Sequence, residues 1–568
     1  MTWSVTLLAV AAVLIVVFVA WLSPRLGVAT PILLVLVGMA CTLIPGAPVV
    51  EIEPDYILTL VLPPLLYSAA VSVPLRDFSR NKGAIAWLSV VLVVVSALGT
   101  GALLWWIFPD LTFAGGVALG AVISPPDAIA ATAIGKRAGL APRLISVLEG
   151  ESLVNDATAL VLLRTAIAAT AGAVSFGGVL GQFAWAIAGG VLIGLVVGAA
   201  SVWVRSKVDQ PSLTTAISFV VPFVAYFPAE AARASGVLAV VVAGLVTGHE
   251  SVRRFSAQDR LSERINWHTV SLLLENGVFL VMGYQLTTLV HDVTQRGESV
   301  WFAVAIGIAC TVVLLVIRSG FIVPLVLMAS HEQARAGQLS GRLTHALDRV
   351  DDMDDTMSGR KQRLSTWLRR KQADAEFFER QDLGWRGGAV LAWSGMRGVV
   401  TLAAAQSLPT SIPYRAQLIL IAFTVAIVTL LVHGTTLPWV IARLGAGGDT
   451  REARLAELAA LMTDVTDATS AFLNDPDLRR GNGKPFDPEV LGSARVRAER
   501  FGHTMLSGDA DGPFAQRWEL RRRLLETQEA ALLEARAIGT YSSDVISIAQ
   551  RYLDEELSRL SYRGEGGD

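Results

Sequence analysis

Long apolar runs alternate with short polar segments along the first 442 residues of the chain. A helix needs about 20 apolar residues to cross a bilayer, and runs of about 17 to 25 residues meet this requirement. We count about thirteen such runs. They lie at residues 3–22, 28–45, 55–72, 83–108, 113–135, 144–170, 176–204, 211–227, 233–248, 270–288, 300–328, 386–407 and 415–442. The eighth and ninth are short and close together, so a merged or re-entrant pair is an alternative to two spans.

Charged residues are few up to about residue 329 and dense in 330–386 and after 443. This predicts a transmembrane domain at 1–442, interrupted by an insertion at 330–386 outside the membrane. The insertion fits a solvated helical linker, with a surface for anionic lipid as the alternative. In 443–568, apolar residues recur every three or four positions around 451–472 and 518–560. We expect a soluble helical domain there, with a regulatory role and no catalytic motif.

Lysine and arginine residues gather in the loops on one side of the predicted spans. That side holds Arg25, Arg76, Arg80, Lys82, Lys136, Arg137, Arg143, Arg205, Lys207, Arg253, Arg254, Arg260 and Arg264, and the other holds Arg233, Arg296 and Arg415. Because basic residues mark cytoplasmic loops, we expect the N-terminus outside the cell and the insertion and tail inside. The membrane expected is the plasma membrane.

Composition agrees with a polytopic membrane protein: 53% of residues are hydrophobic and 17% charged, with a mean hydropathy of +0.52. The first run lacks a basic leader and a small-residue cleavage site, so it is expected to span the membrane. The two cysteines lie in apolar runs and imply no disulfide framework. Basic residues are dispersed in short loops, which argues against nucleic-acid binding. No phosphate-binding glycine loop is found, and no cofactor is expected.

Two adjacent prolines interrupt the fifth run. Pro125 and Pro126 lack amide hydrogens and push Ser124 out of the helical conformation, so the helix must break there. Broken backbone at membrane depth is tolerated only where it is buried in protein or lines a wet cavity. Asp127 follows the break, and we expect it to cap the second half-helix rather than to bind an ion directly. The carbonyl oxygens freed by the break are the likelier ion ligands.

The sixth run carries Ser152, Asn155 and Asp156 at spacings of three and four residues, which places them on one helix face. A hydroxyl, an amide and a carboxylate are oxygen ligands that suit a hard monovalent cation. In a partly dry site, burial favours the protonated carboxyl group, so that a proton and a cation would compete for Asp156. The competing interpretation is an Asn-Asp pair that caps a neighbouring helix.

The twelfth run contains Arg397 between two glycines, in the segment Ser394-Gly-Met-Arg-Gly398. The two interrupted runs occupy matching places if spans 1–6 and 8–13 are two halves, which indicates an inverted-repeat transporter. We expect a structural ion pair of Arg397 with Glu151, with Asp127 as the second choice. Glu275 and Arg318, in the tenth and eleventh runs, are expected to pair with each other as scaffold charges.

These residues resemble those of the monovalent cation/proton antiporters, in the branch of bacterial sodium/proton antiporters and animal sodium/proton exchangers. Glu151-Ser152 followed by Asn155-Asp156 is similar to the branch's Glu-Ser-x-x-Asn-Asp motif. Ser124-Pro-Pro-Asp127 and Gly395-Met-Arg-Gly398 resemble its two interrupted helices, and Leu62-Pro-Pro-Leu-Leu-Tyr67 resembles a segment of its third helix. The likeness spans about residues 10–440 and leaves the tail outside it.

The resemblance implies an all-α fold of two inverted six-helix repeats with broken crossing helices, in a homodimer within membrane lipid. It implies exchange of Na⁺ for H⁺ by alternating access, with Na⁺ at Asp156. Ser152, Asn155 and backbone oxygens of the break, including Pro126, would complete the site, and Asn155 before the aspartate marks the electroneutral members. Potassium or lithium as the cation stays open.

Two positions depart from the branch's pattern. Ser68 stands where many relatives carry an acidic residue, and Pro126-Asp127-Ala128 replaces Thr-Asp-Pro. The first removes a possible ligand or charge and leaves the choice of cation open. The second removes a side-chain hydroxyl but keeps a backbone carbonyl. Two other classes of protein were weighed: an intramembrane aspartyl protease that uses Asp127 and Asp156, and a cation channel. The protease lacks a Gly-x-Gly-Asp motif and gives Arg397 no role, whereas a channel would conduct without proton counterflow.

Overall fold

The computed structural model is helical wherever it assigns regular structure, and the residues it describes contain no β-strand. The described residues are 2–26, 29–44, 56–170, 172, 176–351, 358–380, 383–446, 451–480, 483–496 and scattered positions from 516 to 532. The all-α prediction is therefore confirmed. The helix expected at 518–560 falls almost wholly outside the described residues.

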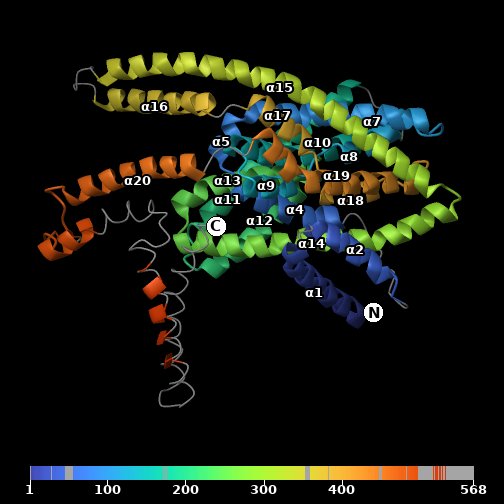
Figure 1. The fold of residues 1–568 in the computed structure, drawn as a ribbon, viewed down its shortest axis with the longest axis horizontal. Coiled ribbons are helices and arrows are strands. Elements are labelled where there is room, and N and C mark those ends of the chain that lie inside the picture. Colours follow the sequence, from blue (N-terminus) through green and yellow to red (C-terminus); the bar gives the residue numbers. More distant parts are fainter. Residues whose placement is uncertain are drawn as a thin grey trace. The chain divides into compact units, whose positions relative to one another are not determined.

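Figure 1 shows the helices in chain order. They are α1 (Thr2–Leu26), α2 (Thr30–Thr42), the π-helical η1 (Ile57–Val61), α4 (Leu62–Ser72), α5 (Leu75–Arg80), α6 (Lys82–Ala86), the π-helical η2 (Trp87–Leu92), α7 (Val93–Ile107), α8 (Phe113–Ile123), α9 (Ala128–Arg137), α10 (Pro142–Thr170), α11 (Phe176–Arg205), α12 (Pro211–Ala231), α13 (Gly236–Arg254), α14 (Ala257–Gln295), α15 (Val300–Asp351), α16 (Ser358–Arg380), α17 (Gly384–Trp393), α18 (Val399–Gln406), α19 (Arg415–Leu444) and α20 (Arg451–Leu473).

Within the described part of the chain, nine helices are long and apolar enough to cross a membrane, and three shorter apolar helices accompany them. The count of thirteen spans stays a prediction, because several expected spans are built from short or broken helices. The eighth and ninth runs form two separate helices, α12 and α13. A turn joins them, and the Ser235 side chain caps α13 by accepting a hydrogen bond from the amide of Leu238 at 3.2 Å.

The helices of residues 1–448 pack in two groups. In one group α13 packs on α4, α11 and α12, while α14 packs on α2 and α12. In the other, α8 packs on α7 and α10, and α15 packs on α7, α17 and α19. Glycines permit the closest approaches: a Cβ atom on Gly283 of α14 would overlap the backbone of α2, and one on Gly116 of α8 would overlap that of α7. The groups meet where α10 contacts α4 and α13, and where α14 contacts α18 and α19.

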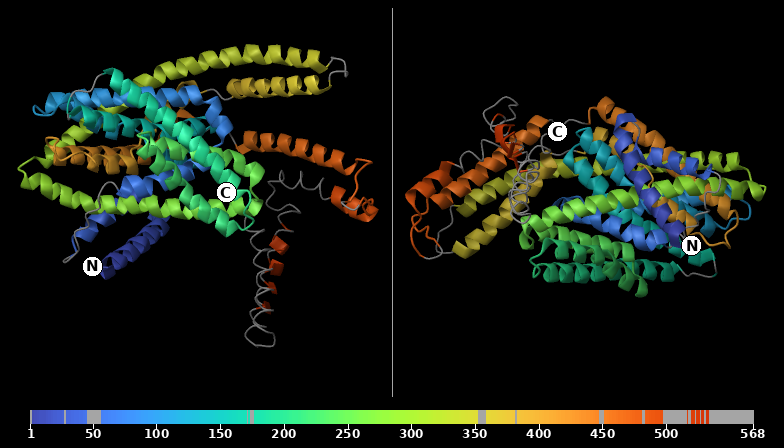
Figure 2. Two further views of the ribbon diagram at one scale, coloured as in Figure 1. Left: turned by 180° about the vertical axis from the view of Figure 1, so that it is seen from behind. Right: turned by 90° about the horizontal axis from the view of Figure 1, so that it is seen from below.

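The predicted insertion forms a helical hairpin. Helix α15 continues without interruption from the membrane-spanning part to Asp351, and α16 packs along it, as Figures 1 and 2 show. Buried apolar side chains between the two helices form a small core of their own, consisting of Ala336, Leu343, Val350, Leu368 and Ala375. The hairpin is thus a packed element rather than an extended linker.

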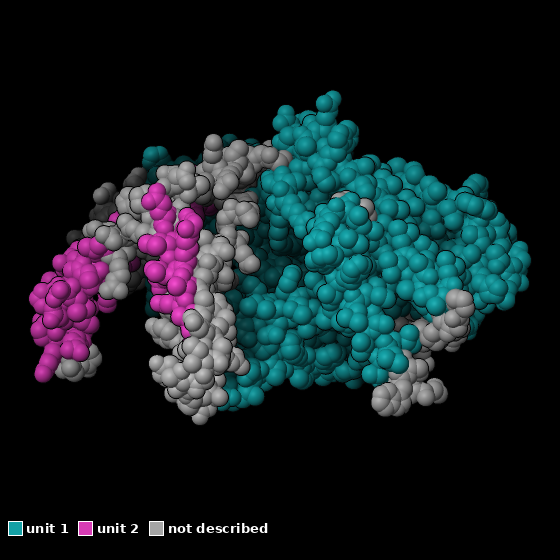
Figure 3. Space-filling model, turned by 60° about the horizontal axis from the view of Figure 1, so that its bottom comes forward, with its two compact units in different colours: residues 1–448 teal, residues 449–568 magenta. Residues whose placement is uncertain are grey.

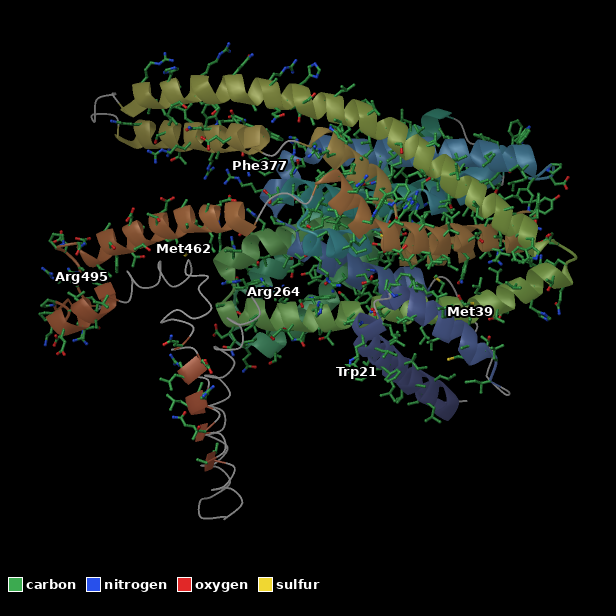
Figure 4. All side chains as sticks on the ribbon, in the orientation of Figure 1. Trp21, Met39, Arg264, Phe377, Met462 and Arg495 are labelled. Atoms are coloured by element: carbon green, nitrogen blue, oxygen red, sulfur yellow. The ribbon has the colours of Figure 1, made fainter. Side chains whose placement is uncertain are left out.

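One end of the hairpin is fixed to the second group of helices. Arg80 of α5 donates to Asp374 of α16 at 2.8 Å and lies over the ring of Phe377; Figure 4 labels Phe377 near the end of α16. Arg143, the second residue of α10, lies over the ring of Phe378 and 3.8 Å from Glu332 of α15. The hairpin therefore holds the first turn of α10.

Residues 449–568 form a second compact unit, drawn in magenta in Figure 3. Its described part includes α20 and a helical segment within residues 488–496. The cytoplasmic location and regulatory role of this unit stay predictions, as does the division into a transmembrane and a tail domain at residue 442.

Candidate ion-binding site

Two broken helices cross inside the second group. The fifth predicted span is α8, a non-helical segment at 124–127, and α9, while the twelfth is α17, a break at 394–398, and α18. The segments touch directly, because the amide of Asp127 donates to the carbonyl of Met396 at 2.7 Å. Backbone groups that the breaks release from helical bonding are thus satisfied by the opposite break.

Arg397 lies where two half-helices end. Its Nε donates to the carbonyl of Ile123, the last residue of α8, at 2.8 Å, and its Nη1 donates to the carbonyl of Gly395 just after α17. The C-terminal end of a helix carries partial negative charge, which a guanidinium stabilises. The side chain is only 5% exposed, and its backbone amide is held by the hydroxyl of Thr429 on α19 at 3.1 Å.

Asp127 lies where the other two half-helices begin. It directly precedes α9, and its carboxylate packs against Gly398, the residue before α18, so closely that a Cβ atom there would overlap it. Helix N-termini carry partial positive charge and favour an anion. The crossing therefore carries a positive side chain, Arg397, where two half-helices end, and a negative one, Asp127, where the other two begin. The specific expectation that Asp127 caps α9 stays a prediction.

Helix α10 presents the expected polar face to this crossing. The Asn155 side chain donates to the carbonyl of Pro126 at 2.8 Å, while its Oδ1 is buried and has no hydrogen-bond partner. Asp156, the next residue, is 7% exposed. Ser152 lies one turn earlier and is half-buried. The structure thus brings Asn155, Asp156 and the Pro126 carbonyl together.

The predicted ion pair of Glu151 with Arg397 was wrong. Both oxygens of the Glu151 carboxylate accept from Arg318 of α15, at 2.5 and 2.9 Å, and both side chains are almost fully buried. The donors of Arg397 are instead used by the backbone at the two breaks. Arg397 still lies close enough to Glu151 and Arg318 for their charges to act on it. Atoms of both arginines lie within 3.5 Å of the position that a Cβ atom of Gly395 would occupy.

The same contacts show that the expected pairing of Glu275 with Arg318 was wrong. Arg318 uses two nitrogens on Glu151 and donates with its Nε to the carbonyl of Leu391 at 2.9 Å. A planar guanidinium is well matched to a carboxylate on one side and a carbonyl on the other. Glu275 of α14 is half-buried.

Two residues whose hydroxyl groups hydrogen-bond to the backbone of the site were not predicted from the sequence. Thr429 binds the amide of Arg397, and Ser89 of η2 donates to the backbone carbonyl of Glu151 at 3.1 Å. The feature of the sequence that could have indicated them is a hydroxyl residue inside a long apolar run. Such residues are common in membrane helices, where they bond to their own backbone, so the signal alone does not separate these two from the rest.

The oxygen atoms beside the crossing differ from a metal-binding cluster. Among the described residues, no three His, Cys, Asp or Glu side chains converge closely enough to hold a metal ion. What converges is one buried carboxylate, an amide oxygen and a carbonyl oxygen. Hard monovalent cations bind neutral oxygens together with a single negative charge.

A bundle of apolar helices, with a carboxylate beside two crossed, broken helices, defines a secondary ion transporter. The model of the transmembrane domain of sodium/hydrogen exchangers matches residues 13–443. The chain belongs to the sodium/hydrogen exchanger family, whose members are multi-pass membrane transporters and not enzymes. The resemblance seen in the sequence is thereby confirmed.

Individual relatives agree with this assignment. A sodium/hydrogen exchanger of Mycobacterium bovis is 30% identical, and the match covers 97% of this chain and 95% of the relative. The Na⁺/H⁺ antiporter ApNhaP of Aphanothece halophytica is 27% identical over 80% of each chain. Among solved structures, the sodium proton antiporter MjNhaP1 of Methanocaldococcus jannaschii matches with a TM-score of 0.57 at 14% identity, covering 78% of this chain and 100% of that chain. The last likeness concerns the fold.

Proposed function

We propose that the protein exchanges Na⁺ for H⁺ across the plasma membrane, one for one, with Asp156 as the group that carries either ion. The observation that supports this most directly is the placement of Asp156. It is buried on α10, beside the crossing of two broken helices. A carboxylate in such a place is strongly disfavoured as a bare charge, and binding either a proton or a cation removes that cost.

The neighbouring oxygens support the cation-bound form. Asn155 Oδ1 is buried without a hydrogen-bond partner, and the Pro126 carbonyl keeps a second lone pair beside the one that Asn155 uses. Ser152 is the further ligand proposed from the sequence, and Asp127 belongs to the site in a supporting role. Glu151 is already neutralised by Arg318, which leaves Asp156 to carry the exchange. A single exchangeable charge gives electroneutral transport.

Reconstitution into proteoliposomes with a trapped pH dye tests the proposal. Addition of Na⁺ outside acid-loaded vesicles should move protons outward, and an imposed membrane voltage should not change the rate. Titration with Li⁺ and K⁺ in turn identifies the preferred cation. A channel would instead pass cations without moving protons, and that result would contradict the proposal.

Asp156→Asn should abolish this exchange, because an amide cannot take up and release a proton near neutral pH. The variant should insert and purify like the wild type. Asp209→Asn changes an exposed carboxylate in the loop after α11 and should exchange ions at the wild-type rate. Wild-type exchange by Asp156→Asn would show that another group carries the ions.

The remaining parts of the proposal follow from the sequence. The N-terminus lies outside the cell and the hairpin inside, and the protein acts as a homodimer in the lipid bilayer. Access of thiol reagents to single cysteines placed near residues 298 and 345 tests the orientation. Labelling of the first position from inside and of the second from outside would contradict it.

A further inference from the structure

Polar side-chain contacts join the two helix groups away from the ion site. Arg164 of α10 donates to Glu230 of α12 at 2.6 Å, which forms an ion pair. Gln406 of α18 donates to Gln285 of α14. Helices α12 and α14 belong to the first group, whereas α10 and α18 belong to the group that carries the ion site. Each contact therefore crosses from one group to the other, and none of the four side chains is an expected ion ligand.

Both contacts lie on the same side of the crossing. Arg164 is near the end of α10, and α11 begins on that side and runs back to Arg205 at the opposite side. Arg205 donates to Glu263, near the start of α14, at 2.7 Å, so α14 begins at the opposite side too. Gln285 lies 22 residues further along α14, about 33 Å at 1.5 Å per residue, which returns it to the side of Arg164.

The two contacts also lie at a similar distance from the ion site. Arg164 follows Asp156 by eight residues on α10, which is about 12 Å along the helix. Gln406 follows Gly398 by the same number of residues on α18, and Gly398 contacts Asp127 at the crossing. The contacts thus form one layer between the groups, about two helical turns from the site.

Glu230 is held in place by its own group of helices. Its Oε1 accepts from the amide of Gly236, the first residue of α13, at 3.0 Å, and a helix N-terminus favours an anion at this place. The fit is close, because a Cβ atom on Gly236 would overlap both Glu230 and Tyr226. Arg164 reaches the same carboxylate with a side chain that is 54% exposed. Separation of the groups would break the bond to Arg164 and leave Glu230 attached to α13.

We propose that Arg164 with Glu230, and Gln406 with Gln285, form an outer latch. The latch keeps the two helix groups together on the side that the proposed function places outside the cell. A site that opens to each side in turn needs the groups to separate there once in each cycle, and both contacts then break. An exposed ion pair is weak, so it biases the groups toward the closed state without preventing opening. The inference rests on the proposed function and adds the residues that close the outer side.

Thiol labelling tests the latch without any measurement of transport. Leu160 lies on α10 four residues from Asp156 and four from Arg164, and it is buried. With both native cysteines replaced by alanine, Leu160→Cys should react slowly with a membrane-impermeant reagent added outside. Glu230→Gln keeps an oxygen for the Gly236 amide but loses the charge, so labelling should become about two- to fivefold faster, the scale of an exposed ion pair.

Two control variants separate the latch from general loosening. Arg164→Lys keeps the positive charge and should label at close to the rate of the unchanged latch. Glu250→Gln breaks a surface pair with Arg254 within α13 and should not alter labelling. An unchanged labelling rate in Glu230→Gln would overturn the proposal.

Cross-linking tests whether the latch must open during transport. Arg164→Cys and Glu230→Cys, joined by a short reducible cross-linker, should lower Na⁺/H⁺ exchange by at least about tenfold, because the groups can no longer separate there. Reduction should restore exchange. Thr42→Cys with Thr287→Cys is the matched control: the two hydroxyls are 3.0 Å apart on α2 and α14 of one group, and cross-linking should leave exchange unchanged.

Exchange that continues at full rate after the latch is cross-linked would overturn the proposal. Should the first cysteine pair fail to insert, Gln285→Cys with Gln406→Cys takes its place with the same expected loss. Failure of both pairs to insert would mark these side chains as folding residues and would also overturn it. If the wild type moved no protons with Na⁺, the proposed function would fail, while the labelling rates would still report on the latch.

Discussion

At the scale of single residues, Glu151 and Arg318 form one of two ion pairs among the described residues in which both side chains are almost fully buried. The two partners are 167 residues apart and both nearly inaccessible. Removing one partner of a buried pair strands the other charge, whereas removing both costs much less. The pair therefore fixes α10 and α15 relative to each other near the ion site.

Arg318→Gln should destabilise the protein by about 3 to 5 kcal/mol, because the Glu151 carboxylate is left buried and unpaired. Thermal unfolding in detergent measures the loss. Arg254→Gln is the control: it breaks a surface pair with Glu250 on one helix, for which about 0.3 to 0.5 kcal/mol is expected. The double variant with Glu151→Gln should recover part of the stability; no recovery would indicate that Arg318 acts through Leu391 alone.

At the scale of helices, the crossing of the two breaks depends on a glycine. Gly398 has the carboxylate of Asp127 where a side chain would begin. Gly434 of α19 offers a matched comparison in the same region, because a Cβ atom there would meet only the Met396 sulfur, at an ordinary distance of 3.6 Å.

Gly398→Ala should therefore lower the rate of Na⁺/H⁺ exchange by at least about tenfold, since the methyl group pushes Asp127 away from the start of α18. Gly434→Ala should exchange at close to the wild-type rate. Proton movement in proteoliposomes compares the two. Equal activity of both variants would show that the contact at Gly398 is not needed for transport.

The helices and the breaks could be predicted because their causes are local. Adjacent prolines at 125 and 126 remove two amide donors whatever surrounds them, and long apolar runs must leave water. The partner of Glu151 could not be predicted, because two arginines in apolar runs were available and sequence spacing does not fix which helix comes nearest. The expected pairing of Glu275 with Arg318 failed for the same reason: Arg318 pairs with Glu151, which lies 167 positions earlier in the chain.

At the scale of the whole transmembrane unit, the described contacts attach the hairpin to α5 and to the start of α10, the helix that carries Asp156. Asp374 and Phe378 of α16 reach Arg80 and Arg143. Because Arg143 begins the helix that carries Asp156, loosening this attachment should let the start of α10 move.

Asp374→Asn combined with Phe378→Ala should lower the maximal rate of exchange by about two- to fivefold. The Na⁺ concentration for half-maximal exchange (K0.5) should stay unchanged, because the attachment is remote from the ion ligands. Rates in proteoliposomes at several Na⁺ concentrations separate the two quantities. Trp367→Ala removes an aromatic side chain of α16 that is 55% exposed and should have no effect. A raised K0.5 in the double variant would mean that the hairpin acts on the site itself.

Helix α15 runs unbroken for 52 residues, a rod of about 78 Å at 1.5 Å per residue. Arg318 lies on it at the depth of the ion site, and its other end forms the tip of the hairpin. Pro324 lies inside this helix, six residues beyond Arg318, and its missing amide hydrogen weakens the helix at that turn. A force on the tip therefore reaches Arg318, and through it Glu151, only across the turn that this proline weakens.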